Sequence, residues 1–220
     1  MQFPRGPVTN KLVIINLVIA AVLLVPSWWN YAVMAGGFFP IRFSNVAVAF
    51  PDTGFLVPTY LTPLSAAFLH GGIAHVLMNM LTLLLIGKMV ERVLGGGLYL
   101  SLYFFSAYAA SATEWLASFM ALPLSIDMMA PAIGASGAIS GVIGAYALLF
   151  PNNKPKAWGP IPADYARPFH LTLAWVGLNL ALGFVGPGIG VAIAIWSHIG
   201  GFIAGLLLAR SMLLWRYRSA

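Results

Sequence analysis

The sequence contains no cysteine and very few charged residues, and both shortages limit what the protein can be. Only 7% of its 220 residues are charged, with five acidic and eleven basic side chains. The absence of cysteine excludes disulfides, thiolate catalysis and cysteine-based metal sites. A soluble domain carries about 25% charged residues, so the low charge excludes an ordinary soluble globular protein.

Apolar residues account for 60% of the chain, and the mean hydropathy is +0.90. They form long unbroken runs instead of alternating with polar residues, which favours transmembrane helices over a closed barrel. The net charge of +6 does not indicate a nucleic-acid partner, because the basic residues lie at the ends of the apolar runs. We therefore expect an all-α integral membrane protein with a single domain over residues 1–220.

Six apolar runs are long enough to cross a membrane. They cover residues 12–34, 68–85, 98–122, 131–150, 169–185 and 189–214, with a loop at 35–65 between the first two. Ten of the eleven basic residues lie on one side of these runs, and Arg42 in the 35–65 loop is alone on the other. The positive-inside rule then predicts that both termini are cytoplasmic and that the 35–65 loop is external.

The fourth run is built largely from glycine, alanine and serine. Gly137 and Gly141 share one helical face, beside the hydroxyl of Ser136. Such rows of small residues let a second helix approach closely, and the sixth run carries a matching pair at Gly201 and Gly205. Packing of the two rows is expected to bring the fourth and sixth runs together next to Ser136.

Polar residues from three runs are expected at similar depths in the outer half of the membrane. At a rise of 1.5 Å per residue, His75, Asn79 and His198 lie about 10, 16 and 13 Å below the outer ends of their runs. Ser136 lies in the outer part of the fourth run, and His70 is expected in the turn before the second. Ionisable groups inside a membrane are costly and are therefore functional candidates.

Ser136 and His198 in hydrogen-bond contact, at about 2.6–3.2 Å, would support nucleophilic acyl transfer. The histidine takes the hydroxyl proton and later returns a proton to the leaving amine. The backbone N–H of Ser136 and the side chains of His75 and Asn79 would hold the oxyanion. Among the acidic residues only Glu114 lies at a comparable depth, so we expect a Ser–His dyad whose ring is held by packing rather than by a carboxylate.

Four motifs in chain order resemble those of the rhomboid family of intramembrane serine proteases. They are the second-helix pattern H-x4-H-x3-N at 70–79, the E-x3-G turn at 91–95, the G-x-S-G nucleophile motif at 134–137 and the sixth-helix motif H-x2-G-x3-G at 198–205. The resemblance implies a compact six-helix rhomboid-like bundle of the bacterial type. It further implies an endopeptidase that cleaves transmembrane segments entering laterally from lipid, in a prokaryotic plasma membrane, without a metal or another cofactor.

The resemblance also assigns roles to single residues. Ser136 is the nucleophile, His198 the general base, and His75 and Asn79 the oxyanion donors. The supporting positions are His70, as a structural or water-organising neighbour, and the glycines Gly134, Gly137, Gly201 and Gly205.

Two positions depart from patterns found in some family members. A tyrosine four residues after the nucleophile stacks on the base in those members, and this chain has Ser140 there. A Trp-Arg pair occupies their first external loop, where this chain offers only Arg42. What orients His198, and whether Arg42 has a role in the loop, are therefore left open by the sequence.

Two other interpretations remain beside the protease. A catalytically inactive rhomboid relative would only bind membrane proteins, although such relatives usually lack the serine or the histidine. A small transporter or metal-ion channel would use His70, His75 and His198 as ligands, but no carboxylate or cysteine is nearby and the helices show no inverted repeat.

Overall fold

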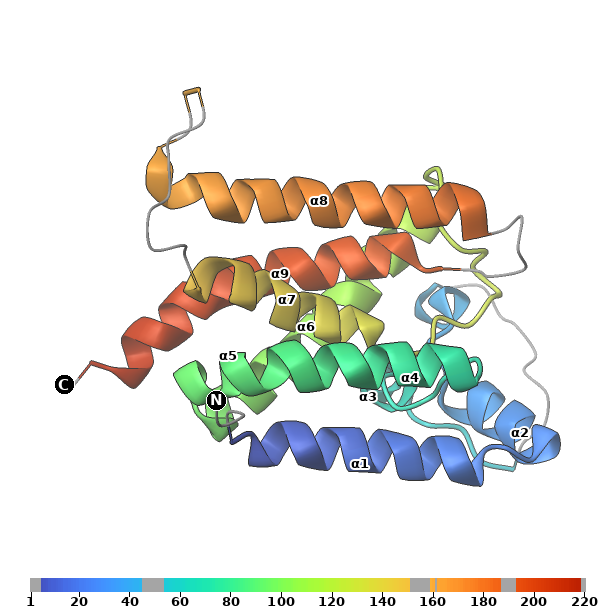
Figure 1. Ribbon diagram of the computed structural model, residues 1–220. Coiled ribbons are helices and arrows are strands. Elements are labelled where there is room, and N and C mark those ends of the chain that lie inside the picture. The colour runs from blue at the N-terminus through green and yellow to red at the C-terminus, as the bar shows by residue number, and fades with distance from the viewer. Residues whose placement is uncertain (1–4, 45–53, 151–158, 161, 187–192, 219–220) are drawn as a thin grey trace.

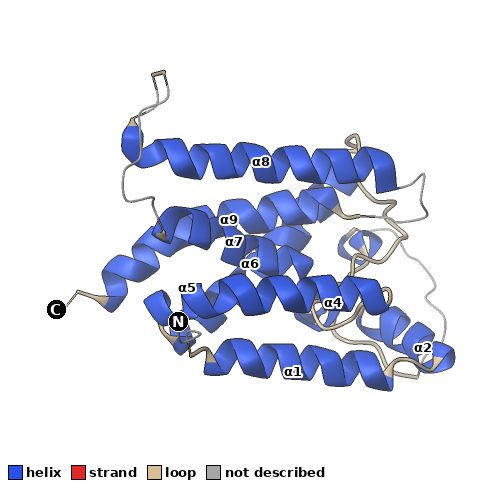
Figure 2. Ribbon diagram, viewed as in Figure 1, coloured by secondary structure: helices blue, strands red, loops and turns tan. Residues whose placement is uncertain are grey.

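The computed structural model describes residues 5–44, 54–150, 159–160, 162–186 and 193–218, and these form a helical bundle without a regular strand (Figure 2). The α-helices are α1 (Pro7–Val22), α2 (Pro26–Gly36), α3 (Thr62–Ala66), α4 (Ile73–Thr82), α5 (Lys88–Leu94), α6 (Gly96–Phe119), α7 (Ser136–Leu149), α8 (Ala163–Val185) and α9 (Ile195–Arg216). The 3₁₀ turns η1 (Pro40–Phe43) and η2 (Thr59–Leu61) precede α3, and the π-helical turn η3 (Leu83–Gly87) joins α4 to α5.

Helix α7 lies at the centre of the bundle against α6 and α9, while α1 and α8 lie at opposite edges (Figure 1). A Cβ atom added at Gly201 would collide with the carbonyl oxygen of Gly137, and one at Gly205 with that of Gly141. The backbones of α7 and α9 are therefore in direct contact, which confirms the packing predicted from the two glycine rows.

The first predicted run, 12–34, is not a single helix. Helix α1 ends at Val22, and α2 begins at Pro26 after a short turn. Proline has no N–H to continue the hydrogen-bond ladder of a preceding helix, but it suits the first turn of a new one. Pro26 occupies that first position in α2, so the predicted span is replaced by a shorter α1 and a separate α2.

The other predicted runs correspond to helices with shifted ends. The second run continues through η3 and α5 as far as Leu94, so Lys88 and Arg92 lie within a helix rather than in a loop. Gly95, with a φ of +77°, ends that segment. The fourth run becomes helical only at Ser136, because residues 131–135 form a non-helical approach to α7 that turns at Gly134 and Ala135. The third, fifth and sixth runs correspond to α6, α8 and α9.

The predicted external loop, 35–65, contains the end of α2, both 3₁₀ turns and most of α3, and its residues 45–53 lie outside the described part. The Ser65 hydroxyl donates to the Gly36 carbonyl at 2.6 Å. Arg42 Nη2 donates to the Val57 carbonyl at 2.8 Å, and partial burial lowers the pKa of this guanidinium. Arg42 therefore has a bracing role within the segment.

Glu91 fastens the start of α1 to α5. Its carboxylate accepts hydrogen bonds from the backbone N–H groups of Val8 and Thr9 at 2.9 and 2.8 Å, and from the Thr9 hydroxyl at 2.7 Å. The first N–H groups of a helix have no partner within it. A carboxylate from another helix therefore satisfies the exposed donors of α1, as a capping residue would.

Two of the described helical segments, Ile73–Leu94 and Ile195–Arg216, are long and apolar enough to cross a membrane. Three apolar segments are shorter, namely Pro7–Val22, Ser136–Leu149 and Phe169–Val185. Helix α1 begins and α9 ends at the same end of the bundle (Figure 1). The six spans and the cytoplasmic position of the termini remain predictions.

Candidate active site

Ser136 and His198 meet between α7 and α9. The His198 Nε2 atom lies 2.8 Å from the Ser136 Oγ atom, within the distance range predicted for a nucleophile and its base. Ser136 is the first residue of α7, and His198 lies in the first turn of α9, where its N–H donates to the Ala194 carbonyl. The glycine contacts between the two helices bring the hydroxyl and the imidazole together.

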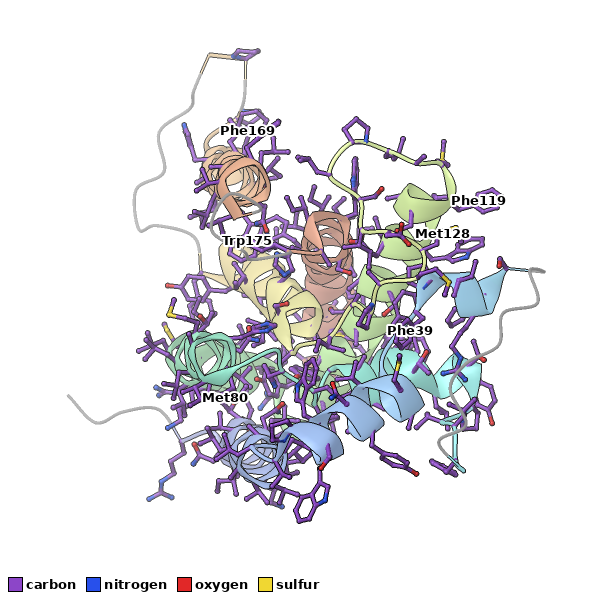
Figure 3. The ribbon with its side chains drawn as sticks, turned by 90° about the vertical axis from the view of Figure 1, so that its right-hand side faces the viewer. Phe39, Met80, Phe119, Met128, Phe169 and Trp175 are labelled. Atoms are coloured by element: carbon purple, nitrogen blue, oxygen red, sulfur yellow. The ribbon has the colours of Figure 1, made fainter. Side chains whose placement is uncertain are left out.

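The His198 ring is also held by a hydrogen bond that the sequence analysis missed. Its Nδ1 atom lies 2.6 Å from the Oδ1 atom of Asn179, a buried residue of α8. The sequence predicted a ring held by packing rather than by a carboxylate, and the structure adds a hydrogen bond to a neutral amide, which that prediction did not include. Packing contributes as well, because the Trp175 ring lies 6.3 Å from that of His198 and stacks on Phe202 at 6.2 Å. Figure 3 shows Trp175 on the side of α8 that faces the bundle.

His75 and Asn79 lie one turn apart on α4, and the His75 imidazole comes close to the nucleophile. A Cβ atom added at Gly134 would lie 2.7 Å from His75 Nε2 and 3.6 Å from Ser136 Oγ, so the imidazole edge and the hydroxyl flank one small space. The Gly71 N–H donates to His75 Nδ1 at 3.4 Å. An accepting Nδ1 leaves the proton of a neutral ring on Nε2, which then faces this space as a donor.

Asn79 is buried, and its amide nitrogen Nδ2 makes no hydrogen bond to any described residue. A buried donor without a partner costs about 1–3 kcal/mol. Such groups are rare in folded proteins and usually have a functional reason. Among the described residues, the Asn79 Nδ2 atom is therefore a buried donor that is free to bind an oxygen atom of another molecule.

His70 does not contact the Ser136 hydroxyl. Its Nε2 accepts a hydrogen bond from the Ala135 N–H at 3.5 Å, and its ring meets that of His75 edge-on at 5.1 Å. The His70 carbonyl accepts a hydrogen bond from Trp29 Nε1 at 2.8 Å. His70 thus braces the chain immediately before the nucleophile, as expected for a structural neighbour.

Glu114 of α6 lies near the site, but no hydrogen bond between described residues joins it to His198. Its buried carboxylate accepts hydrogen bonds from the N–H groups of Ser197 and Ile126, at 2.8 and 3.1 Å. Ser197 belongs to the first turn of α9, whose N–H groups need partners from outside the helix. Glu114 therefore fixes the start of α9, and with it the backbone that carries His198.

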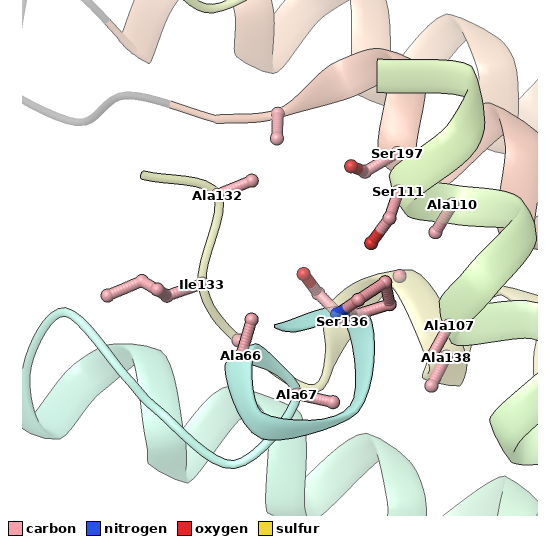
Figure 4. A pocket seen from close by; sticks show the side chains of 14 residues that line it. Ala66, Ala67, Ala107, Ala110, Ser111, Ala132, Ile133, Ser136, Ala138 and Ser197 are labelled. Atoms are coloured by element: carbon pink, nitrogen blue, oxygen red, sulfur yellow. The ribbon is translucent and has the colours of Figure 1, made fainter. Parts of the chain in front are cut away.

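A small cavity of about 40 Å³ opens beside the nucleophile. The Ser136 hydroxyl points into it (Figure 4). Much of its wall is alanine, contributed by Ala66, Ala67, Ala107, Ala110 and Ala132. The cavity has room for a small side chain only.

Taken together, the fold and the site define a helical protein with a paired serine and histidine inside its bundle. A model of the Rhomboid domain matches residues 58–215, and the chain belongs to the rhomboid family. Members of this family are integral membrane proteins that act on membrane proteins.

Several relatives are similar over about 69% of this chain. RHOMBOID-like protein 4 of Arabidopsis thaliana is 36% identical, over 34% of its own length. Rhomboid protein 1, mitochondrial, of Saccharomyces cerevisiae is 31% identical over 41% of its length, and Rhomboid protease GluP of Bacillus subtilis is 34% identical over 25%. The chain thus spans less than half the length of these relatives. Because they include plant and mitochondrial proteins, they do not support the predicted prokaryotic plasma membrane.

Proposed function

We propose that this protein is an intramembrane serine endopeptidase that hydrolyses peptide bonds in the transmembrane segments of other membrane proteins. The observation that carries the proposal is the 2.8 Å contact between Ser136 Oγ and His198 Nε2 inside a helical bundle. Membership of the rhomboid family, and the likeness to a Bacillus subtilis protein named as a rhomboid protease, support the same activity.

The proposed reaction has two stages. His198 Nε2 accepts the Ser136 proton while Oγ attacks the scissile carbonyl, and the imidazolium then protonates the leaving amine. Water, deprotonated by the same Nε2, attacks the carbonyl carbon of the acyl-enzyme. The imidazolium then returns this proton to Ser136 Oγ as the acyl C–O bond breaks and the new carboxyl end is released. The oxyanion of each tetrahedral intermediate is bound, in this proposal, by the Ser136 N–H, His75 Nε2–H and Asn79 Nδ2–H. The nearness of His75 Nε2 to the space beside Ser136 Oγ supports this assignment, as does the Asn79 Nδ2 atom, which has no partner among the described residues.

The alanine-walled cavity beside Ser136 suits a substrate with a small side chain next to the cleaved bond. A larger side chain would overlap the cavity wall, and overpacking costs about 1–3 kcal/mol. We propose that substrates reach the site laterally from lipid, in a molecule with six spans and cytoplasmic termini.

Asn79→Ala is expected to lower kcat by about 10²–10³-fold while KM stays nearly constant, because an oxyanion donor acts in the transition state. The thermal midpoint should stay close to that of the wild type, since Asn79 Nδ2 has no partner among the described residues to lose. Cleavage of a transmembrane substrate in proteoliposomes measures the first effect. Met78→Ala, at a side chain that is 64% exposed, is the matched control. A large loss of stability with unchanged kcat would make Asn79 a purely structural residue.

The proposal as a whole is tested on the purified wild-type protein in detergent with a fluorophosphonate probe and a transmembrane substrate. We expect covalent labelling and cleavage, both unchanged by EDTA. A protein that neither reacts nor cleaves, beside an active rhomboid control, would instead favour a membrane-protein binder. Zinc binding or zinc flux in place of cleavage would favour the small transporter or metal-ion channel with His70, His75 and His198 as ligands.

A further inference from the structure

Asn179 is the only described partner of the second nitrogen of the proposed base. Its Oδ1 lies 2.6 Å from His198 Nδ1, and only 1% of the residue is exposed. The residue belongs to α8, outside all four motifs that suggested the activity. An amide buried at this position between apolar helices is costly unless its polar atoms are paired.

The orientation of the Asn179 amide follows from its other hydrogen bond. Nδ2 donates to the Trp175 carbonyl, one turn earlier on α8, at 2.8 Å. Reversing the amide would set its oxygen against that carbonyl oxygen and lose the bond. The group that faces His198 is therefore the acceptor Oδ1, and it accepts a proton from Nδ1.

This assignment settles which nitrogen of the neutral ring carries the proton. With the proton on Nδ1, the Nε2 lone pair faces Ser136 Oγ at 2.8 Å and can accept the hydroxyl proton. In the other tautomer Nε2–H would donate to the hydroxyl, and the ring would not act as a base. A change of tautomer alone lowers the turnover of a serine protease by about 10⁴-fold when a charged partner is replaced.

We propose, on the basis of the function proposed above, that Asn179 is a positioning residue that holds His198 in the tautomer able to accept the Ser136 proton. Because Asn179 is carried by α8, the base is set only while α8 lies against α9. The ability of His198 to act as a base then depends on the position of α8, through the hydrogen bond between Asn179 and His198.

The test compares Asn179→Leu, Asn179→Asp and wild type in the full-length protein. Leucine fills similar space without an acceptor, and aspartate keeps an oxygen acceptor. We expect Asn179→Leu to lower the fluorophosphonate labelling rate and kcat by about 10–100-fold, the range found for outer-shell partners of metal-ligating histidines, with KM nearly unchanged. Asn179→Asp should stay within about tenfold of the wild type. Leu180→Ala, on an exposed face of α8, should label at the wild-type rate.

A second readout is the ¹⁵N spectrum of protein labelled at histidine, with the His198 signals assigned by their loss in His198→Ala. We expect protonated Nδ1 and unprotonated Nε2 in wild type and Asn179→Asp, and a shift of the proton toward Nε2 in Asn179→Leu. An unchanged tautomer together with an unchanged labelling rate in folded Asn179→Leu would overturn the proposal. If Asn179→Leu does not fold, loss of the Nδ1–H form in folded Asn179→Asp would overturn it. A wild-type protein that fails to label would refute the protease function, while the spectrum would still report the tautomer.

Discussion

Ser136→Ala should abolish covalent labelling by a fluorophosphonate and reduce substrate cleavage by about 10⁶-fold. The probe forms a bond only with an activated oxygen, and the Ser136 hydroxyl is the one within 2.8 Å of a histidine base. Removal of the nucleophile in a serine protease lowers kcat by about 10⁶-fold, and removal of its base has nearly the same effect. His198→Ala should therefore also show no fluorophosphonate labelling.

Ser140→Ala is the matched control for this experiment. Ser140 lies one turn further along α7, is buried, and donates its hydroxyl to the Ser136 carbonyl at 2.7 Å. Its substitution removes a serine hydroxyl from the same helix without touching His198, so labelling should persist. Labelling that survived in Ser136→Ala would identify a different nucleophile and would contradict the proposed mechanism.

Gly205→Val should cost at least about 3 kcal/mol of stability, at the upper end of the usual range for overpacking. A Cβ atom at Gly205 would already collide with the Gly141 carbonyl oxygen and lie 2.7 Å from its carbonyl carbon. Both are backbone atoms in the central helix, so no side chain can turn aside to make room. For a chain of this size the thermal midpoint should fall by about 6–12 °C, and labelling should disappear at temperatures where the wild type is still active.

The same substitution at Gly177 separates this clash from the intrinsic effect of valine in a helix. Gly177 lies within α8, and a Cβ atom there would meet nothing within 4 Å. Valine has a slightly better helix propensity than glycine, so Gly177→Val should leave the midpoint unchanged or raise it slightly. Equal destabilisation at Gly177 and Gly205 would contradict the close approach of α7 and α9.

The meeting of Ser136 and His198 could be predicted from sequence because two independent patterns indicated it. The glycine rows fixed which helices pack, and the constant rise per residue fixed the depth of each polar group. Both depend only on local spacing, which survives small errors at the helix ends. Membership of the rhomboid family agrees with the resemblance seen in the motifs.

Asn179 and the break at Pro26 were missed for different reasons. Asn179 belongs to no motif, and it is a neutral amide rather than an ionisable group. An asparagine in the middle of an apolar run is nevertheless a signal that the sequence contains. Pro26 also signals a helix break, but the uninterrupted apolar composition of 12–34 favoured a single span in the prediction. The partners of Glu91 and Glu114 could not be predicted, because each carboxylate binds the N–H groups of a helix distant in sequence.

The length of α7, only fourteen residues, has a consequence for the predicted membrane span. At 1.5 Å per residue this helix is about 21 Å long, whereas the hydrocarbon layer of a typical bilayer is about 30 Å thick. In the predicted span the non-helical approach at 131–135 would supply the missing height. Two of its backbone N–H groups are satisfied by the protein, because the Ala132 N–H donates to the Phe38 carbonyl and the Gly134 N–H to the Ala66 carbonyl. Non-helical backbone is tolerated at membrane depth only where it is buried in protein or lines a water-filled cavity, so the neighbouring elements that accept these hydrogen bonds would make a short central helix possible in a membrane.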